Sequence, residues 1–452
     1  MSGGVRDAAI WRLLVAAITA LLLSLAAGSA ASQAAMPDPS FGENGFSFVA
    51  PGVLKSAAYG MTIDRSGRVI LTGRGGPRGD QFYAARISRD GSPDASFGDA
   101  GISVTAFSSG SRSVAIANAA TVQRSGKIVA TGLFNAAGRV YRFSMVVNAR
   151  FNFDGSVDYP FSGEGRDWTG NYRAYTGNAI TQDRRGRFLT AATGSGNKIG
   201  WADYGLLNRY YANGEPDPTL NGGLRRRRSG QIKIAAGVKR QITLQDVIAM
   251  RDGRILVSGN YGASFMVSRL RPNGSYDVTF GRGGRAAVDV NGRGPCGCRT
   301  LALGMARTKR GKIVVAGESQ RPGFEDTFPR TPYLVIAQFN ANGTRDRSFG
   351  RNGIVRFGLK KGITANDVAV QRNGRIVVVG ESDFYMTAMR FMPNGRIDRS
   401  FFRNGLYRKA VFGQDTLARK VMIDRAGRIV VAGGTDQAGT AFALRILPNA
   451  KP

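Results

Sequence analysis

The residue types that most enzymes use as acid, base or metal ligand are scarce in this sequence. None of the 452 residues is histidine. This absence excludes a Ser-His-Asp or Cys-His nucleophile system and the histidine-containing zinc sites. No catalytic motif is recognisable either. We therefore predict that the chain is not an enzyme, and that it holds no cofactor and no metal.

Carboxylates are the remaining groups that could carry out acid–base chemistry. Asp246 and Asp367 occupy the same position in two of the repeated segments described below, and Lys420 occupies it in a third. If that position faces a central channel, the three side chains meet there. Carboxylate-based cleavage of a saccharide in the channel is then the alternative to a binding function. The other interpretation is that these are solvated or hydrogen-bonded residues of the channel.

The formal net charge is +32, and it suggests attraction to an anionic partner. The single dense run of positive charge lies in a loop between two predicted strands and consists of Arg225, Arg226, Arg227 and Arg228. The run has two interpretations: a solvated loop, or a contact with a polyanion such as a wall polymer, lipid headgroups, an acidic polysaccharide or nucleic acid. Most other arginines are scattered, so a basic composition without function is the second interpretation of the net charge.

Cys296 and Cys298 are the only cysteines, and a single glycine separates them. An oxidising compartment favours a disulfide between them, which is strained but feasible across one glycine. Free thiols and a redox or metal role are the other two interpretations.

The first 35 residues are typical of a signal peptide. Arg6 and Arg12 give a basic start, an apolar run covers residues 13–28, and small residues follow. An uncleaved membrane anchor is the alternative, although the run is short for a span. No second apolar segment of this kind follows. We expect a secreted or envelope-associated protein with no transmembrane segment after cleavage.

Residues 36–452 contain a repeat with two markers. The first is a hairpin turn and strand, as in RSGRVILTG from Arg65, and it recurs about every 60 residues. Its seven turn glycines are Gly67, Gly126, Gly186, Gly253, Gly311, Gly374 and Gly427. The second marker resembles PDPSFGENG, and its aspartates are Asp38, Asp94, Asp158, Asp217, Asp277, Asp346 and Asp398.

Each copy contains four short stretches with strand character, joined by turns in which glycine supplies a positive φ. Such a sheet cannot bury both faces alone, but copies packed face to face around an axis can. We predict an all-β fold, a single-domain, seven-bladed β-propeller of four-stranded antiparallel blades. A right-handed β-helix is the alternative, but its coils are much shorter than this repeat.

The two ends of the mature chain predict how the ring closes. The last copy stops at Asn449, just before its expected aspartate, and the mature N-terminus supplies Asp38 at that point. The strand near residues 46–49 should therefore complete the last blade. Closure of this kind removes an unpaired sheet edge.

The repeat resembles the delta-60 repeat family of bacterial β-propellers. The matching pattern is G-[KR]-[IV]-[VL]-x-x-G followed by F-x-x-x-R-x-x-x-[DN]-G-x-x-D-x-S-F-G-x-x-G, and it covers residues 37–449. The third and fourth copies depart most from it. The resemblance implies a secreted propeller and brings no catalytic residues.

Most repeat aspartates have an arginine eight residues earlier, across a turn. The predicted pairs are Arg86 with Asp94, Arg150 with Asp158, Arg209 with Asp217, Arg269 with Asp277, Arg390 with Asp398, and Arg445 with Asp38. The fifth copy has Gln338 before Asp346. We predict ion pairs that brace the hairpins, each worth roughly 0–1 kcal/mol if exposed. Calcium bound by the D-G-x-x-D segment is the alternative, but it lacks enough oxygen ligands.

These observations favour a monomeric binding module whose ligand is an anionic cell-envelope or extracellular polymer, or another envelope protein. Ligand choice in propellers is determined by loops. The loops that vary most between copies cover residues 194–204, 221–241, 290–299 and 318–332.

Overall fold

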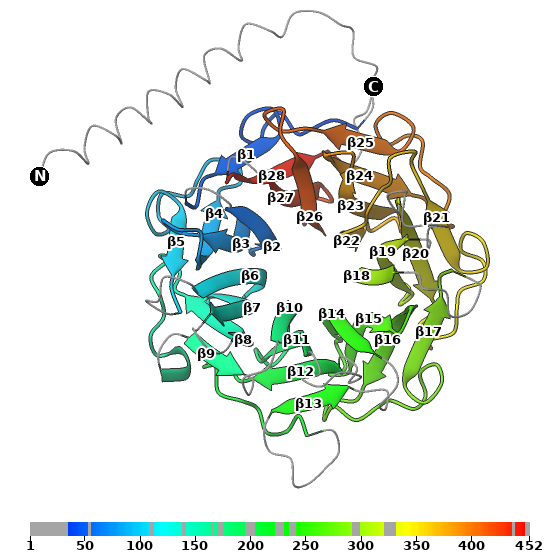
Figure 1. The fold of residues 1–452 in the computed structure, drawn as a ribbon, viewed down its shortest axis with the longest axis horizontal. Helices are drawn as coiled ribbons and strands as arrows, with labels where there is room; N and C mark the ends of the chain where they lie inside the picture. The colour runs from blue at the N-terminus through cyan, green and yellow to red at the C-terminus, as the bar shows by residue number, and fades with distance from the viewer. Residues whose placement is uncertain are drawn as a thin grey trace, which may run out of the picture.

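The described part of the computed structural model consists of seven four-stranded antiparallel sheets arranged as blades around a central axis (Figure 1). This confirms the predicted seven-bladed propeller. The residues described are 35–52, 56–107, 113–137, 142–163, 166–169, 175–194, 204–221, 230–234, 241–291, 299–320, 331–435 and 439–447. In this part of the chain, no helix is both long and apolar enough to cross a membrane.

The first three blades each use four consecutive strands. Blade 1 contains β2 (Ala57–Ile63), β3 (Val69–Gly75), β4 (Gln81–Ile87) and β5 (Ile102–Thr105). Blade 2 contains β6 (Ser113–Val122), β7 (Ile128–Ala137), β8 (Arg142–Phe151) and β9 (Arg166–Thr169), with the short helix η2 (Phe161–Gly163) before β9. Blade 3 contains β10 (Tyr175–Gln182), β11 (Phe188–Gly194), β12 (Tyr204–Tyr210) and β13 (Gln231–Ile234).

The next three blades repeat this order, and the last one is shared between the two ends of the chain. Blade 4 contains β14 (Ile242–Ala249), β15 (Ile255–Tyr261), β16 (Ser264–Leu270) and β17 (Arg285–Asp289). Blade 5 contains β18 (Arg299–Arg307), β19 (Ile313–Gln320), β20 (Pro332–Phe339) and β21 (Ile354–Phe357). Blade 6 contains β22 (Asp367–Val370), β23 (Ile376–Ser382), β24 (Tyr385–Phe391) and β25 (Leu406–Lys409). Blade 7 contains β26 (Thr416–Ile423), β27 (Ile429–Thr435), β28 (Ala441–Ile446) and β1 (Phe46–Val49).

The middle strands of the blades are buried on both faces. β27 is buried at all of its seven residues, which is why its sequence IVVAGGT does not alternate between apolar and polar. Its residues Val430 and Ala432 share a core with Leu71 and Tyr83 of blade 1. The hydrophobic cores therefore lie between neighbouring blades.

The N-terminal strand closes the ring. β1 pairs antiparallel with β28, with Phe46 opposite Leu444. Asp38 N donates to the carbonyl oxygen of Arg445 at 2.8 Å, so the closing turn has the same backbone bond as the continuous turns, such as Asp94 N to Arg86 O. Residues about 400 positions apart thus form one blade, as the sequence predicted.

Candidate functional site

The repeated arginine–aspartate partners are in contact in all six copies. The Nε–Oδ2 distances are 2.7 Å for Arg86–Asp94, 2.6 Å for Arg150–Asp158, 2.8 Å for Arg209–Asp217, 2.7 Å for Arg269–Asp277, 2.8 Å for Arg390–Asp398 and 2.7 Å for Arg445–Asp38. The arginines are buried rather than exposed, and Arg390 is only 1% accessible. The value of roughly 0–1 kcal/mol for an exposed ion pair therefore does not apply to these buried pairs.

Five of the motif arginines, Arg86, Arg150, Arg209, Arg269 and Arg445, also donate to a backbone carbonyl of the next blade. Arg269 Nη1 donates to the carbonyl oxygen of Ala341 in blade 5 at 2.9 Å, and its guanidinium stacks on Phe280 with 4.8 Å to the ring centroid. Burial opposes ionisation of Asp277, but hydrogen bonds from Thr279 and Arg269 lower its pKa to about 2. The repeated Arg–Asp motif is therefore a contact that joins adjacent blades. The sequence reasoning missed this link because it considered only the partner in the same hairpin.

The fifth copy keeps the aspartate but lacks the arginine. Asp346 pairs instead with Lys312, whose Nζ lies 2.6 Å from Asp346 Oδ2. The equivalent hairpin cation in blade 4, Arg254, lies 3.3 Å from Asp277. In both blades, a cation from the preceding hairpin therefore contacts the motif aspartate. In blade 4 it adds to Arg269, and in blade 5 it replaces the missing arginine.

Asp246, Asp367 and Lys420 lie at one register position of the innermost strands β14, β22 and β26. Asp246 and Lys420 each follow a β-bulge, and they pair with Ser258 and Ala432 respectively. Asp367 pairs with Val379 on the matching strand of blade 6. A bulge changes the direction in which the next side chain points.

Both aspartates bind the backbone of the neighbouring blade. Asp246 Oδ2 accepts from Met305 N at 2.9 Å, and Asp367 Oδ2 accepts from Val421 N at 2.9 Å. A Cβ added to Gly304, the equivalent residue of blade 5, would lie 2.7 Å from Asp367 Oδ1. The glycine therefore makes room for the carboxylate.

The three charges act on one another. Burial raises the pKa of Asp246 to about 6, with Lys420 opposing this rise and the charge of Asp367 adding to it. Burial also raises the pKa of Asp367, again with Lys420 opposing. A carboxyl that titrates near pH 6 can act as a general acid. The hydrogen bond from Met305 N to Asp246 equally supports a structural role, in which this carboxylate joins blades 4 and 5.

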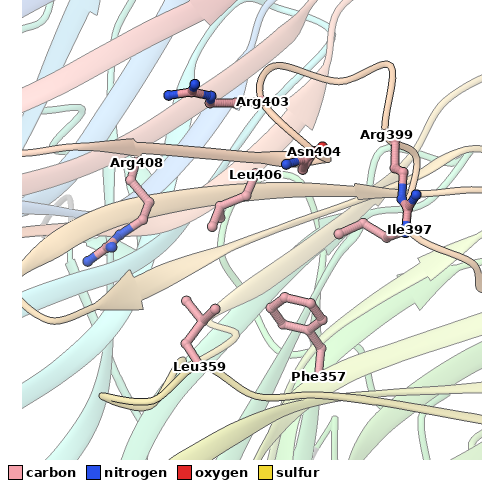
Figure 2. A pocket seen from close by; sticks show the side chains of 8 residues that line it. All are labelled: Phe357, Leu359, Ile397, Arg399, Arg403, Asn404, Leu406 and Arg408. Carbon is pink, nitrogen blue, oxygen red and sulfur yellow. The ribbon is translucent and has the colours of Figure 1, made fainter.

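A groove lies on the outer side of the ring, between the outermost strands β21 and β25. Its volume is about 720 Å³, and it is lined by Phe357, Leu359, Ile397, Arg399, Arg403, Asn404, Leu406 and Arg408. Figure 2 shows Arg408 and Arg399 at opposite ends, with Leu406, Leu359 and Phe357 between them. The apolar lining residues continue the core between blades 5 and 6.

The arginines of the groove are accessible and largely uncompensated. Arg399, Arg403 and Arg408 are all exposed. Within the described residues, Arg399 and Arg403 contact no carboxylate, while Arg408 lies 3.8 Å from Asp383. Excess positive charge beside an apolar surface suits a ligand that is anionic and has apolar faces.

The equivalent space between blades 4 and 5 is arranged differently. Arg356, the counterpart of Arg408, donates from Nε to the carbonyl oxygen of Val290 at 2.7 Å and so crosses to the neighbouring blade. Arg408 instead donates from Nη2 to Ser382 O within its own blade, at 3.1 Å. The sequence reasoning missed this groove, because the fifth and sixth copies share the pattern R-S-F-[GF]-R-N-G and the direction of Arg356 and Arg408 depends on packing.

Several predicted residues lie outside the described part of the chain. These are Arg225, Arg226, Arg227 and Arg228, Cys296 and Cys298, and residues 1–34 of the predicted signal peptide. The expectations about polyanion contact, disulfide formation and export therefore stay predictions.

Comparison with known proteins supports a β-propeller repeat family. The family model described as "Domain of unknown function (DUF5122) beta-propeller" matches residues 251–280 and 371–401. In blades 4 and 6, these stretches cover the turn between the first two strands and the Arg–Asp motif. The narrower resemblance to the delta-60 repeat family stays a resemblance. No curated protein sequence matches this chain.

Solved structures align with most of this chain at low identity. An oxidoreductase (glucose dehydrogenase) from Thermus thermophilus is 14% identical, with 89% of this chain and 100% of that chain covered and a TM-score of 0.40. The α-L-arabinanase of Penicillium chrysogenum is 10% identical, with 92% and 98% covered and a TM-score of 0.40. The GH93 α-L-arabinofuranosidase of Fusarium graminearum is 10% identical, with 72% and 91% covered and a TM-score of 0.42.

These structures correct the prediction that the chain is not an enzyme. All three are named as enzymes, which contradicts that prediction. The similarity is too low to transfer any of these activities to this chain.

Proposed function

We propose that this propeller is an exported binding module for an anionic, carboxylated saccharide polymer of the cell envelope or extracellular matrix. The observation that carries the proposal is the groove between β21 and β25, where Arg399 and Arg403 line the same space as apolar residues and have no acidic partner among the described residues. Guanidinium groups bind carboxylates through two parallel hydrogen bonds, and the C–H faces of sugar rings suit Phe357 and Leu406.

The test is the affinity of the mature protein for a galacturonic acid oligomer, measured by calorimetry against a neutral galactose oligomer of equal length. We expect binding of the acidic oligomer only, and a loss of roughly 10- to 100-fold in R399S/R403S. The fifth blade offers a matched control, because R347S/R351S removes the same charge from the equivalent turn. An equal loss of affinity in R399S/R403S and R347S/R351S would show that only the net charge matters, and would contradict the proposal.

The titration of Asp246 favours a second candidate function, which is carboxylate-based cleavage of a saccharide near the axis. Glycoside hydrolysis uses two carboxyl groups, one of which has a raised pKa. Asp246 has a pKa of about 6 and is affected by the charge of Asp367, which lies two blades away. Release of reducing ends from polysaccharides would reveal it. Activity lost in D246N and in D367N would support this candidate, whereas no release from acidic or neutral polymers would exclude it for those substrates.

A further inference from the structure

Three phenylalanines have a positive φ, a backbone conformation that residues other than glycine usually avoid. Phe384, Phe402 and Phe412 have φ angles of 68°, 43° and 52°, and all lie in blade 6 or directly after it. In blades 1, 4, 5 and 7 the position of Phe402 is occupied by glycine, as at Gly350. A bulky residue in this region costs conformational energy, and such outliers cluster at functional sites.

Two of these phenylalanines project from the tips of neighbouring turns. Phe384 is in the two-residue turn between Ser382 and Tyr385, and Phe412 is in the turn between Val411 and Gln414. Their exposed fractions are 65% and 51%, and that of Tyr385 is 41%. We name Phe384, Tyr385 and Phe412 the aromatic rim.

Hydrogen bonds place the two turns side by side. Thr416 N donates to the carbonyl oxygen of Phe384 at 2.9 Å, and Thr416 Oγ1 accepts from Val411 N at 2.9 Å. A single threonine thus holds both turns. The aromatic rim is one surface rather than separate exposed residues.

Cations surround the aromatic rim. Lys361 Nζ lies 3.0 Å from Asp383, and Arg408 stacks on Tyr385 with 4.7 Å from its Cζ to the ring centroid. Lys360 and Lys409 are exposed on the adjoining segments. Asp383 is shared by Lys361 and Arg408, and Asp415 directly precedes Thr416. The four cations Lys360, Lys361, Arg408 and Lys409 outnumber these two carboxylates.

We propose that the aromatic rim is a membrane-contact surface that binds the headgroup layer of an anionic lipid bilayer. Apolar side chains on turn tips form a convex surface, which cannot enclose a ligand but can insert into a deformable layer. Aromatic rings with flanking lysine and arginine are the combination that the interface of an anionic bilayer attracts. Arg408 lines the groove and also stacks on Tyr385, so the two surfaces adjoin, but the aromatic rim does not include Arg399 or Arg403. The inference therefore goes beyond the proposed saccharide binding.

The test is sedimentation of the mature protein with vesicles of phosphatidylcholine alone or mixed with phosphatidylglycerol. We expect binding to the mixed vesicles, reduced at least about tenfold in F384G/F412G, because two exposed rings are lost. Glycine adopts positive φ without strain, so this variant is expected to fold. Its far-ultraviolet circular dichroism and thermal midpoint verify that.

The matched control is Y159S/V278S, which removes two equally exposed apolar side chains from other blades and should bind as the wild type does. R399S/R403S should also keep vesicle binding, which separates this surface from the groove. Equal binding of wild type and F384G/F412G, or no preference for anionic vesicles, would overturn the proposal. Loss of galacturonate binding rather than vesicle binding in F384G/F412G would also overturn it, and would reassign the aromatic rim to the saccharide.

Discussion

At the scale of single residues, one residue type serves two purposes in this chain. The motif arginines are buried and bonded to aspartate, to a phenylalanine face and to the next blade, as at Arg269. Arg399 and Arg403 lie in the turn between β24 and β25, after the strand that carries Arg390, and are exposed to solvent. Arginine count alone therefore says little about binding, because the spacing to aspartate decides which arginines are structural.

Replacing a motif arginine should lower the free energy of unfolding without abolishing folding, because a second cation remains near the aspartate. R269Q removes the contacts with Asp277 and Ala341 but leaves Arg254 near the aspartate, as Lys312 is near Asp346 in the fifth copy. We expect a loss of about 2–4 kcal/mol in the free energy of unfolding, measured with urea. R271Q, at an exposed position, is the control. A loss in R269Q no greater than in R271Q would contradict the blade-joining role.

Asp246 should make stability depend on pH in the opposite sense from the motif aspartates. Its folded pKa of about 6 exceeds the ordinary value of 3.8, so the folded state binds the extra proton between these pH values. The free energy of unfolding should therefore fall as pH rises from about 4 to 6, by about 1–3 kcal/mol from this group.

D246N lacks the titration and should lose that slope. Urea unfolding of both proteins at several pH values between about 4 and 7 measures the difference. The same slope in D246N and wild type would assign the effect to other groups.

At the scale of elements, the sequence predicts strands and turns well, because local chemistry dictates them. Glycine at a positive φ marks the turns, as at Gly67 with φ of 81°, and the β-branched runs that follow form the buried middle strands. The interblade groove was not predictable. It depends on whether Arg356 or Arg408 crosses to the neighbouring blade, and both follow the same local sequence.

Two glycines of one turn should differ in their tolerance of alanine. Gly281 and Gly283 have similar φ angles of 55° and 61°, but a Cβ at Gly281 would lie 2.3 Å from the carbonyl oxygen of Arg285, whereas Gly283 has nothing within 4 Å. We expect G283A to cost about 1 kcal/mol from backbone strain alone, and G281A to cost at least about 1 kcal/mol more. Thermal unfolding compares them, and equal midpoints would contradict the close approach.

At the scale of the whole molecule, stability depends on closing the ring. β1 covers the edge of β28, and Asp38 pairs with Arg445 across the two ends of the chain. The sequence predicted this closure, because the last copy lacks its motif aspartate and the first turn of the mature chain supplies Asp38. It could not predict how the charge of +32 divides between buried pairs and exposed surfaces, because that division depends on packing.

Removing the closing strand should open the ring. A chain that begins at residue 50 lacks β1, so β28 becomes an unpaired edge that can associate with other chains. We expect the thermal midpoint to fall by about 5–10 °C and dimers or larger species to form, as seen by size-exclusion chromatography. A monomeric truncated protein with an unchanged midpoint would show that closure is not required.

The most direct test of the central claim is hydrogen–deuterium exchange of the mature protein with and without a galacturonic acid oligomer. We predict slower exchange in peptides that cover residues 357–359 and 397–409, and no change in peptides that cover residues 289–291 and 345–355, the equivalent region between blades 4 and 5. Protection confined to the loop of Arg225 to Arg228, or to β14, β22 and β26 near the axis, would contradict the assignment of the groove as the binding site.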